Sequence, residues 1–495
     1  LHAERPRPRT RLSRGSGSMT PDRHRGRYPP YLVLAAFVVL LLSPTVIGAA
    51  ALVAAAVGTE IFRQARNRPA RPEPASDASV ATVLGTTQSG EPFRLTDRQL
   101  SAHTLILGAA GAGKTNTLLT ILGDHVARGR AAVVIDMKGS KAFARELDAA
   151  AQRAGRPFRL WTLDGPSHWN PLANGNPSEL KDRLISAERW TEPHYQRAAE
   201  RYVQTVLQVW ADARPDRPPT LTDVVALMDH RRLSVMLRDV PRERAQQIQN
   251  YLASLTPDQL SAVRGLETRL AIIAESHAGH YLDPGASGTI DLQAAMRDRE
   301  VVLFSLNSSR YGQLAAQVGA LVAQDLNAAM GSRLEQSGAM EPVMIGVDEL
   351  SALGAEHVLN LVARGREALF PVVAATQELA DIQRVARGLA DQLLGIPGIK
   401  IAHRQDLPES ARMIAEVAGT ERVWEQTYHT DRRALLPDRD TGRGTRRQVE
   451  RYRVEPDTIK TLAPGEAVVI TKIPTSSVEK VRVRPPRRKD QMERE

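Results

Sequence analysis

The chain has 495 residues, 42% of them hydrophobic, which is enough for a large core and more than one domain. It contains no cysteine, and this excludes a disulfide framework and thiolate metal sites. Residues 1–72 carry 12 arginines and 3 acidic residues, whereas the rest of the chain has 54 basic and 53 acidic residues. Nine of the ten net positive charges therefore belong to the N-terminal segment, and the net charge does not indicate that the body of the chain binds nucleic acid.

An uncharged stretch near the N-terminus predicts a membrane anchor. Residues 1–30 are rich in Arg, Pro, Ser and Gly and are expected to be disordered. Residues 32–58 have no charged side chain and would extend about 40 Å as a helix, against about 30 Å for a bilayer core. This stretch exceeds the apolar region of a signal peptide, so we predict a transmembrane anchor over residues 31–62. Flanking arginines leave open a single tilted span or a short hairpin turning at Ser43-Pro44, and the length favours the single span.

The body of the chain reads as an α/β domain after a Pro- and Ala-rich linker at residues 63–80. Short strands are expected at 82–85 and 92–95. Apolar strands at 104–107 and 131–136 are separated by a segment of helical length, which is typical of a βαβ unit with a parallel sheet. Further strands are predicted at 301–306, 343–347, 371–375 and 399–402.

A long segment without strand-like runs interrupts this pattern. Between residues 176 and 295, apolar side chains recur at helical spacing, as at Tyr202, Val206 and Trp210. We therefore predict an all-helical insertion over 176–295. The α/β domain would then comprise residues 81–175 and 296–480, followed by a basic tail at 481–495.

One motif assigns the α/β domain a chemistry. Residues 108–115 match the phosphate loop G-x-x-x-x-G-K-[ST], in which glycines let successive backbone N–H groups face phosphate oxygens. A strand precedes the motif and a helix follows it, so the positive end of the helix adds to the anion site. Lys114 is expected to reach the β- and γ-phosphates, and Thr115 to bind Mg²⁺. The predicted nucleotide-binding residues are Gly108, Ala109, Ala110, Gly111, Ala112, Gly113, Lys114, Thr115 and Asn116.

A second apolar strand ends in two carboxylates. Val343, Met344, Ile345 and Val347 precede Asp348-Glu349. In P-loop enzymes such an Asp holds Mg²⁺. A following Glu can polarise the attacking water, which favours ATP hydrolysis. We therefore predict ATP and Mg²⁺ as cofactors, with Thr115 and Asp348 as metal ligands and Lys114 and Glu349 as catalytic residues.

Other polar residues near these motifs allow two interpretations each. Gln377 follows a strand and could sense the γ-phosphate, or it could simply cap the strand. Arg364 and Arg366 are expected on a helix, where such an arginine could complete a neighbouring subunit's site, or could face solvent or pair with Glu367. Asp136 and Lys138 end a core strand and could contact nucleotide or pair with each other.

Taken together, these elements resemble the conjugative type IV coupling proteins, the TraG/TraD group within the FtsK–HerA superfamily of P-loop ATPases. The resembling elements, in chain order, are the N-terminal anchor, residues 103–115, residues 133–139, Asn170-Pro171-Leu172, the helical insertion, Asp348-Glu349, Arg366, Gln377 and residues 465–469. The resemblance implies a RecA-like P-loop fold and a homo-hexameric ring with DNA in its pore. It also implies that the helical insertion helps to recognise single-stranded DNA carried by a relaxase.

The function expected from this resemblance is an ATP-driven DNA translocase at the bacterial inner membrane. Its ATPase domain would be cytoplasmic, and it would couple the relaxase–DNA substrate to the proteins of a type IV secretion channel. One alternative is another ring motor, either an FtsK-like DNA pump or an ATPase that secretes only protein. The other is a non-catalytic membrane adaptor switched by nucleotide.

Overall fold

The computed structural model describes residues 81–486, apart from 189, 286–287, 337–339, 378, 380–381, 383–387 and 434–435. These residues belong to one compact unit, Asp77–Glu495. The predicted anchor at 31–62 and its linker lie outside the described residues. Among the helices that are described, none combines the length and the apolar character needed to cross a bilayer.

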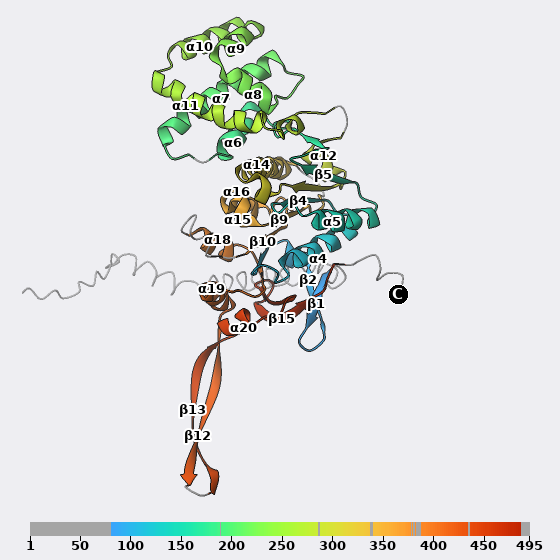
Figure 1. The fold of residues 1–495 in the computed structure, drawn as a ribbon, viewed down its shortest axis with the longest axis vertical. Coiled ribbons are helices and arrows are strands. Elements are labelled where there is room, and N and C mark those ends of the chain that lie inside the picture. Colours follow the sequence, from blue (N-terminus) through green and yellow to red (C-terminus); the bar gives the residue numbers. More distant parts are fainter. Residues whose placement is uncertain are drawn as a thin grey trace, which may run out of the picture. The chain divides into compact units, whose positions relative to one another are not determined.

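The centre of this unit is an eleven-stranded sheet in the order β2-β1-β15-β14-β11-β3-β10-β9-β4-β8-β5 (Figure 1). Its strands are β1 (Ala81–Thr87), β2 (Pro92–Thr96), β3 (Thr104–Leu107), β4 (Ala132–Asp136), β5 (Phe158–Thr162), β8 (Val301–Ser305), β9 (Met344–Asp348), β10 (Val372–Thr376), β11 (Ile399–Ala402), β14 (Glu466–Thr471) and β15 (Ser477–Val483). From β11 to β5 every neighbouring pair is parallel, and the pairs from β11 to β2 are antiparallel. All parallel strands thus end at one edge of the sheet.

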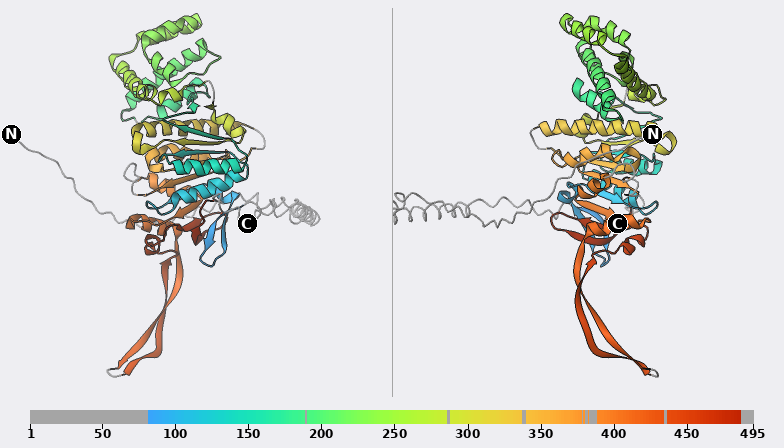
Figure 2. Two further views of the ribbon diagram at one scale, coloured as in Figure 1. Left: turned by 45° about the vertical axis from the view of Figure 1, so that its right-hand side comes forward. Right: turned by 90° about the vertical axis from the view of Figure 1, so that its left-hand side faces the viewer.

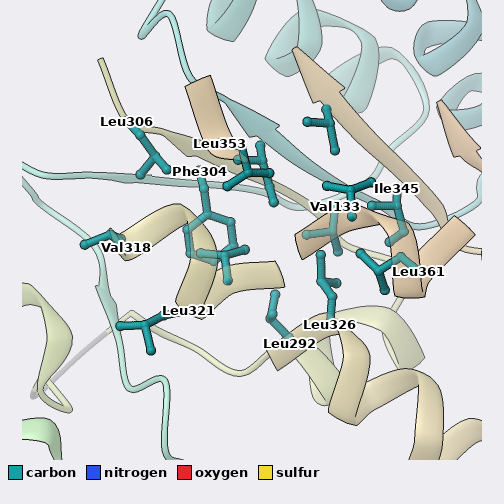
Figure 3. Close-up of a cluster of buried hydrophobic side chains, with 14 of the residues drawn as sticks. Val133, Leu292, Phe304, Leu306, Val318, Leu321, Leu326, Ile345, Leu353 and Leu361 are labelled. Carbon is teal, nitrogen blue, oxygen red and sulfur yellow. The ribbon is translucent and has the colours of Figure 1, made fainter. Parts of the chain in front are cut away.

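The parallel strands form because their side chains are apolar on both faces. Along β4, Val133 faces one hydrophobic cluster and Val134 faces the other, and all five residues of the strand are buried. Helices cover both faces of the sheet. Figure 3 shows one cluster, where Val133 and Ile345 of the sheet meet Leu326 of a covering helix. The chain therefore has the α/β architecture expected from its strand pattern.

The helices of the α/β part occupy the segments between the strands. They are α3 (Asp97–Leu100), α4 (Lys114–Ala127), α5 (Lys141–Arg153), α12 (Leu292–Arg297), α13 (Ser308–Tyr311), α14 (Gln313–Glu335), α15 (Leu350–Leu353), α16 (Ala355–Arg364), α18 (Leu389–Gly395), α19 (Pro408–Ala418) and α20 (Pro456–Lys460). Helices α4 and α5 contribute to one hydrophobic cluster, and α14, α16, α18 and α19 contribute to the other.

The predicted insertion consists mainly of helices, which Figure 2 shows in green. They are α6 (Pro177–Ser186), α7 (Pro193–Ala213), α8 (Leu221–Met228), α9 (His230–Met236), α10 (Arg242–Ala253) and α11 (Pro257–Ala274), with short 3₁₀ turns at Leu237–Asp239 and Gly279–Leu282. Side-chain caps define several of their starts: Asn176 and Glu179 form a reciprocal capping box at α6.

The expectation that this segment is entirely helical is wrong at its C-terminal end. A two-residue strand, β7 (Thr289–Ile290), pairs in parallel with β6 (His168–Trp169) of the α/β part. The basic tail also begins later than expected. β15 continues to Val483, and Val481 and Val483 are buried in the core because they complete the antiparallel side of the sheet.

A long ribbon near the C-terminus was not predicted from the sequence. β12 (Thr420–Arg433) and β13 (Leu436–Tyr452) pair antiparallel in a sheet of their own and extend away from the central sheet (Figures 1 and 2). The described side chains of this ribbon are mostly exposed, as for Trp424 with 55% exposure. Strands with mostly exposed side chains need no alternation of apolar and polar residues, so the pattern that identifies half-buried strands is not expected there.

Candidate nucleotide-binding and hydrolysis site

The predicted phosphate loop connects the C-terminal end of β3 to the first turn of α4. Gly111 and Gly113 adopt φ values of 72° and 121°, which L side chains rarely adopt. At Gly108 a Cβ atom would lie 2.7 Å from Cβ of His403, so this glycine is required by close packing. The loop therefore has the backbone freedom and the helix N-terminus that phosphate binding needs.

Lys114 lies within this loop and is buried. Its Nζ donates hydrogen bonds to the carbonyl oxygens of Gly108 at 2.5 Å and Ala109 at 3.0 Å. The ammonium is thus held over the loop whose backbone N–H groups would face a phosphate.

His403 packs against Gly108 and Gly113 of the phosphate loop, and it was not identified from the sequence. It follows β11, and its Nδ1 donates to the Glu466 carbonyl at 2.8 Å, because that oxygen can only accept. Its Nε2 then accepts from the Thr117 hydroxyl at 2.8 Å. The pKa of His403 is lowered to about 4, mainly because the ring is buried. The hydrogen bond to Glu466 raises the pKa, and the charge of Lys114 lowers it further. A neutral imidazole therefore ties α4 to β14.

The two predicted metal ligands are adjacent in the structure. Thr115 Oγ1 donates to Asp348 Oδ2 at 3.0 Å, and Asp348 ends β9 with only 1% exposure. A hydroxyl and a carboxylate at this distance are the oxygen ligands that Mg²⁺ prefers. These residues therefore fit the Mg²⁺ that the phosphate-loop motif implies, and Lys114 and the loop backbone would face the phosphates of its nucleotide.

Glu349 follows Asp348 in a strained backbone conformation. Its φ of 62° and ψ of 56° place a non-glycine residue in the left-handed region, which costs about 1–3 kcal/mol and is concentrated at functional sites. Its backbone N–H donates to Asp348 Oδ1 at 3.0 Å. This turn directs the Glu349 carboxylate toward the same sheet edge as the phosphate loop.

Gln377 contacts both halves of the site. It directly follows β10, which lies between β3 and β9 in the sheet. Its Nε2 donates to Glu349 Oε1 at 2.7 Å, and its carbonyl oxygen accepts the N–H of Gly108 at 3.4 Å. Gln377 thus connects the phosphate loop, through its backbone carbonyl, to the predicted catalytic carboxylate, through its side-chain amide.

Lys138 belongs to this site and does not pair with Asp136. Its Nζ lies 3.0 Å from Glu349 Oε2 and 3.3 Å from Asp348 Oδ2. Burial alone would lower the pKa of Lys138, but the charges of Asp348 and Glu349 raise the pKa above its usual value. The Asp136 carboxylate instead accepts backbone N–H groups of Lys138 and Ser140, at 2.9 and 2.8 Å. Asp136 therefore shapes the loop, and burial raises the pKa of its carboxyl.

Arg366 lies away from this cluster. Arg364 is the last residue of α16, but Arg366 is in the turn beyond it, so the expectation of a helical position is wrong for Arg366. That turn leads into the N-terminal end of β10, next to His103 at the start of β3. The phosphate loop is at the other end of β3, about 13 Å along the strand. Arg366 is exposed and lies at the edge of the sheet opposite its own phosphate loop.

Ala110, Gly111 and Asn116 are the exposed members of the predicted binding set, whereas Ala109 and Ala112 are buried. Ala109 donates its N–H to the carbonyl of Arg404 at 2.8 Å, and Ala112 accepts the N–H of Gly465 at 2.9 Å. Backbone hydrogen bonds thus join the phosphate loop to residues 404 and 465, which are distant in the sequence. A linear motif does not reveal such contacts.

Two family profiles match the chain. Residues 92–257 match the type IV secretion-system coupling protein DNA-binding domain, and residues 342–464 match the TraM recognition site of TraD and TraG. The first match contains the phosphate loop, and the second contains Asp348, Glu349 and Gln377. None of the curated protein sequences compared with the chain matches it.

Solved structures share the fold. The unbound monoclinic form of the bacterial conjugative coupling protein TrwBdeltaN70 aligns with a TM-score of 0.60 and 15% identity, over 82% of this chain and 89% of that chain. The plasmid coupling protein TrwB in complex with ADP and Mg²⁺ aligns with a TM-score of 0.57 and 13% identity, over 81% and 89%. VirB4 of Thermoanaerobacter pseudethanolicus aligns with a TM-score of 0.53 and 15% identity, over 83% and 98%.

The profiles and the structures agree on one architecture. The aligned structures share the α/β fold of this chain, and the two profiles match residues on either side of its middle, 92–257 and 342–464. The chain therefore belongs to the type IV secretion-system coupling protein family.

Proposed function

We propose that this chain is an ATP-hydrolysing motor that moves DNA, carried with its relaxase, into a type IV secretion channel. The observation that carries the proposal is the convergence of Lys114, Thr115, Asp348, Glu349 and Gln377 at one edge of the sheet. This set contains a phosphate-binding cation, a pair of metal ligands and a carboxylate that can activate water. A protein that binds nucleotide as a switch, without hydrolysing it, would not require the carboxylate that can activate water.

The residues divide the reaction between them. Bound Mg²⁺ would neutralise phosphate charge during transfer to water. Lys114 and the loop N–H groups hold the phosphates, and Thr115 and Asp348 supply oxygen ligands. Glu349 orients the attacking water and accepts its proton at a carboxylate oxygen. Gln377 positions that carboxylate through its hydrogen bond to Oε1.

The position of Arg366 favours a ring with shared sites. It is exposed at the edge of the sheet opposite its own phosphate loop, which separates it from its own site and leaves it accessible to another subunit. We therefore propose a homo-hexamer in which Arg366 stabilises phosphate charge in the adjacent site.

The membrane and the channel complete the proposal. We propose that residues 31–62 anchor the chain in the bacterial inner membrane, with the ATPase domain in the cytoplasm. The profile over residues 342–464, which describes recognition of TraM, includes the exposed ribbon β12–β13. This part of the chain is suited to contact partner proteins, because the ribbon extends away from the ATPase core.

ATP hydrolysis by the full chain, purified in detergent, tests the motor proposal with and without single-stranded DNA. We expect DNA to stimulate hydrolysis and the protein to displace streptavidin from the end of a biotinylated strand. Lys114→Ala should abolish both activities, and Glu349→Gln should bind ATP without turning it over. Lys141→Ala, an exposed lysine at the start of α5, serves as the matched control.

Each alternative function predicts a different outcome. Nucleotide binding by the unaltered chain without hydrolysis, in the presence of Mg²⁺ and DNA, would favour an adaptor. Hydrolysis that DNA does not stimulate, without streptavidin displacement, would favour a motor that acts on protein. DNA translocation that needs no relaxase or secretion channel in cells would favour an FtsK-like pump.

A further inference from the structure

The feature that carries a further inference is the ion-pair contact of Lys138 with both acidic residues of the site. Lys138 Nζ lies 3.3 Å from each carboxylate oxygen of Asp348 and 3.0 Å from Oε2 of Glu349. The lysine side chain is 35% exposed, whereas the side chains of Asp348 and Glu349 are 1% and 13% exposed. The Lys138 ammonium is therefore the most exposed of the three charged groups, and it contacts both of the buried carboxylates.

The main chain directs Lys138 to this position. The Asp136 carboxylate accepts N–H groups from Lys138 and Ser140, and this fixes the turn after β4. Gly139 follows with φ of 68°, and a Cβ atom there would lie 2.4 Å from Cβ of Asn307. The turn is thus packed against the segment after β8.

The same oxygens have a second use in the proposed reaction. Asp348 Oδ2 contacts both Lys138 Nζ and Thr115 Oγ1. Asp348 Oδ2 and Thr115 Oγ1 are the oxygen atoms expected to bind Mg²⁺. Two cations at one carboxylate repel each other, and the repulsion is stronger in a partly buried site than in water. Glu349 Oε1 accepts from Gln377, whereas Oε2 is buried without a hydrogen-bond partner and has the Lys138 ammonium 3.0 Å away as its ion-pair partner.

We propose that Lys138 is an internal cation that competes with Mg²⁺ for Asp348 and holds Glu349 away from water until the metal and its nucleotide bind. The competition sets the metal concentration at which the site fills. Release of Glu349 Oε2 by Lys138 then makes this oxygen available to the attacking water. This inference rests on the proposed ATPase function, and it assigns Lys138 a positioning role that the phosphate-loop motif does not contain.

Mn²⁺ binding tests the competition without turnover. Mn²⁺ would be titrated into the full chain in detergent, without nucleotide and then with ADP, and free Mn²⁺ followed by electron paramagnetic resonance. Lys138→Met keeps the length of the side chain and removes its charge, and we expect it to bind Mn²⁺ about tenfold more tightly, or ~1.4 kcal/mol. Lys138→Arg and the control Lys141→Met should remain within twofold of the unaltered chain.

A gain in affinity separates this role from a purely structural one, because damage to the site would weaken metal binding. Unchanged or weaker Mn²⁺ binding by Lys138→Met would overturn the inference. In the Glu349→Gln background the gain should persist, since the competition acts through Asp348, and its loss would also overturn the inference. If the unaltered chain bound no Mn²⁺ with ADP, the proposed ATPase function itself would fail.

Discussion

Gln377 donates a hydrogen bond from Nε2 to Oε1 of Glu349 over a distance of 2.7 Å. The same residue accepts the N–H of Gly108 at its carbonyl oxygen. A displacement of the phosphate loop can therefore reach the predicted catalytic carboxylate through one residue. The sequence alone left Gln377 undecided between a γ-phosphate sensor and a strand cap, and the contact with Glu349 favours an active role.

Gln377→Ala should lower the turnover of ATP while leaving its affinity almost unchanged. Loss of a hydrogen bond to a charged group costs about 1.5–3 kcal/mol, which corresponds to a roughly 10- to 150-fold lower kcat if the bond positions Glu349 in the transition state. Steady-state hydrolysis and binding of a fluorescent ADP analogue would measure the two effects separately. If the kcat of Gln377→Ala stays within twofold of the kcat of the unaltered chain, Gln377 only caps its strand and does not position Glu349.

Arg366→Ala should bind ATP normally and fail to hydrolyse it, because the arginine lies at the edge of the sheet opposite its own phosphate loop. Mixing Arg366→Ala subunits with Lys114→Ala subunits should restore part of the activity. Some interfaces in a mixed ring would then pair an intact loop with an intact arginine. Hydrolysis by the mixture, with mixed rings verified by crosslinking, is the measurement. If such rings form and remain inactive, the arginine does not act between subunits.

The buried pair of Arg183 and Asp325 should be essential for stability. Arg183 Nη1 lies 3.1 Å from Asp325 Oδ1, and Trp169 Nε1 donates to Asp325 Oδ2 at 3.1 Å. The pair joins α6 of the insertion to α14 of the α/β part. Asp325→Ala would leave a buried guanidinium without a counter-ion, at a cost of about 3–5 kcal/mol. Denaturant unfolding should show this loss, whereas Glu335→Ala, an exposed position on α14, should change the free energy of unfolding very little.

Acid should destabilise the fold through three buried histidines. Burial is the main cause that lowers the pKa of His103, His125 and His403 to about 4, aided by nearby Arg366, by Arg130 and Arg128, and by Lys114 respectively. The unfolded chain, with histidine pKa values of about 6.5, binds more protons below pH 6.5. The stability from these neutral rings is therefore complete above pH 6.5 and is lost as the pH falls toward 4.

The size of the acid effect can be bounded. Each histidine contributes up to about 3 kcal/mol over this range. Asp325, Asp136 and Glu188 act in the opposite direction, since burial raises the pKa of each carboxyl, that of Asp325 to about 6, and their contribution is lost as the pH rises. Denaturant midpoints at pH 7 and pH 5 test the sum, and we expect the lower midpoint at pH 5. Equal or greater stability at pH 5 would contradict the assignment of neutral histidines.

The sequence was sufficient for features that are local in the chain. The phosphate loop was recognisable because consecutive backbone N–H groups bind phosphate, so residues 108–115 carry the whole motif. The strand before Asp348 was recognisable because a strand covered on both faces is a continuous apolar run. The helical insertion was recognisable from apolar spacing, although its end at β7 was not.

Only the tertiary structure decided which distant residues meet. Lys138 reaches Asp348 across 210 positions of the chain, and His403 reaches Thr117 across 286, because parallel strands bring their C-terminal ends to one edge of the sheet. The sequence places Arg366 close to Asp348, yet the turn before β10 carries it to the opposite edge. The ribbon β12–β13 also escaped prediction, because its strands pair with each other and most of its described side chains are exposed, so burial does not select apolar residues there.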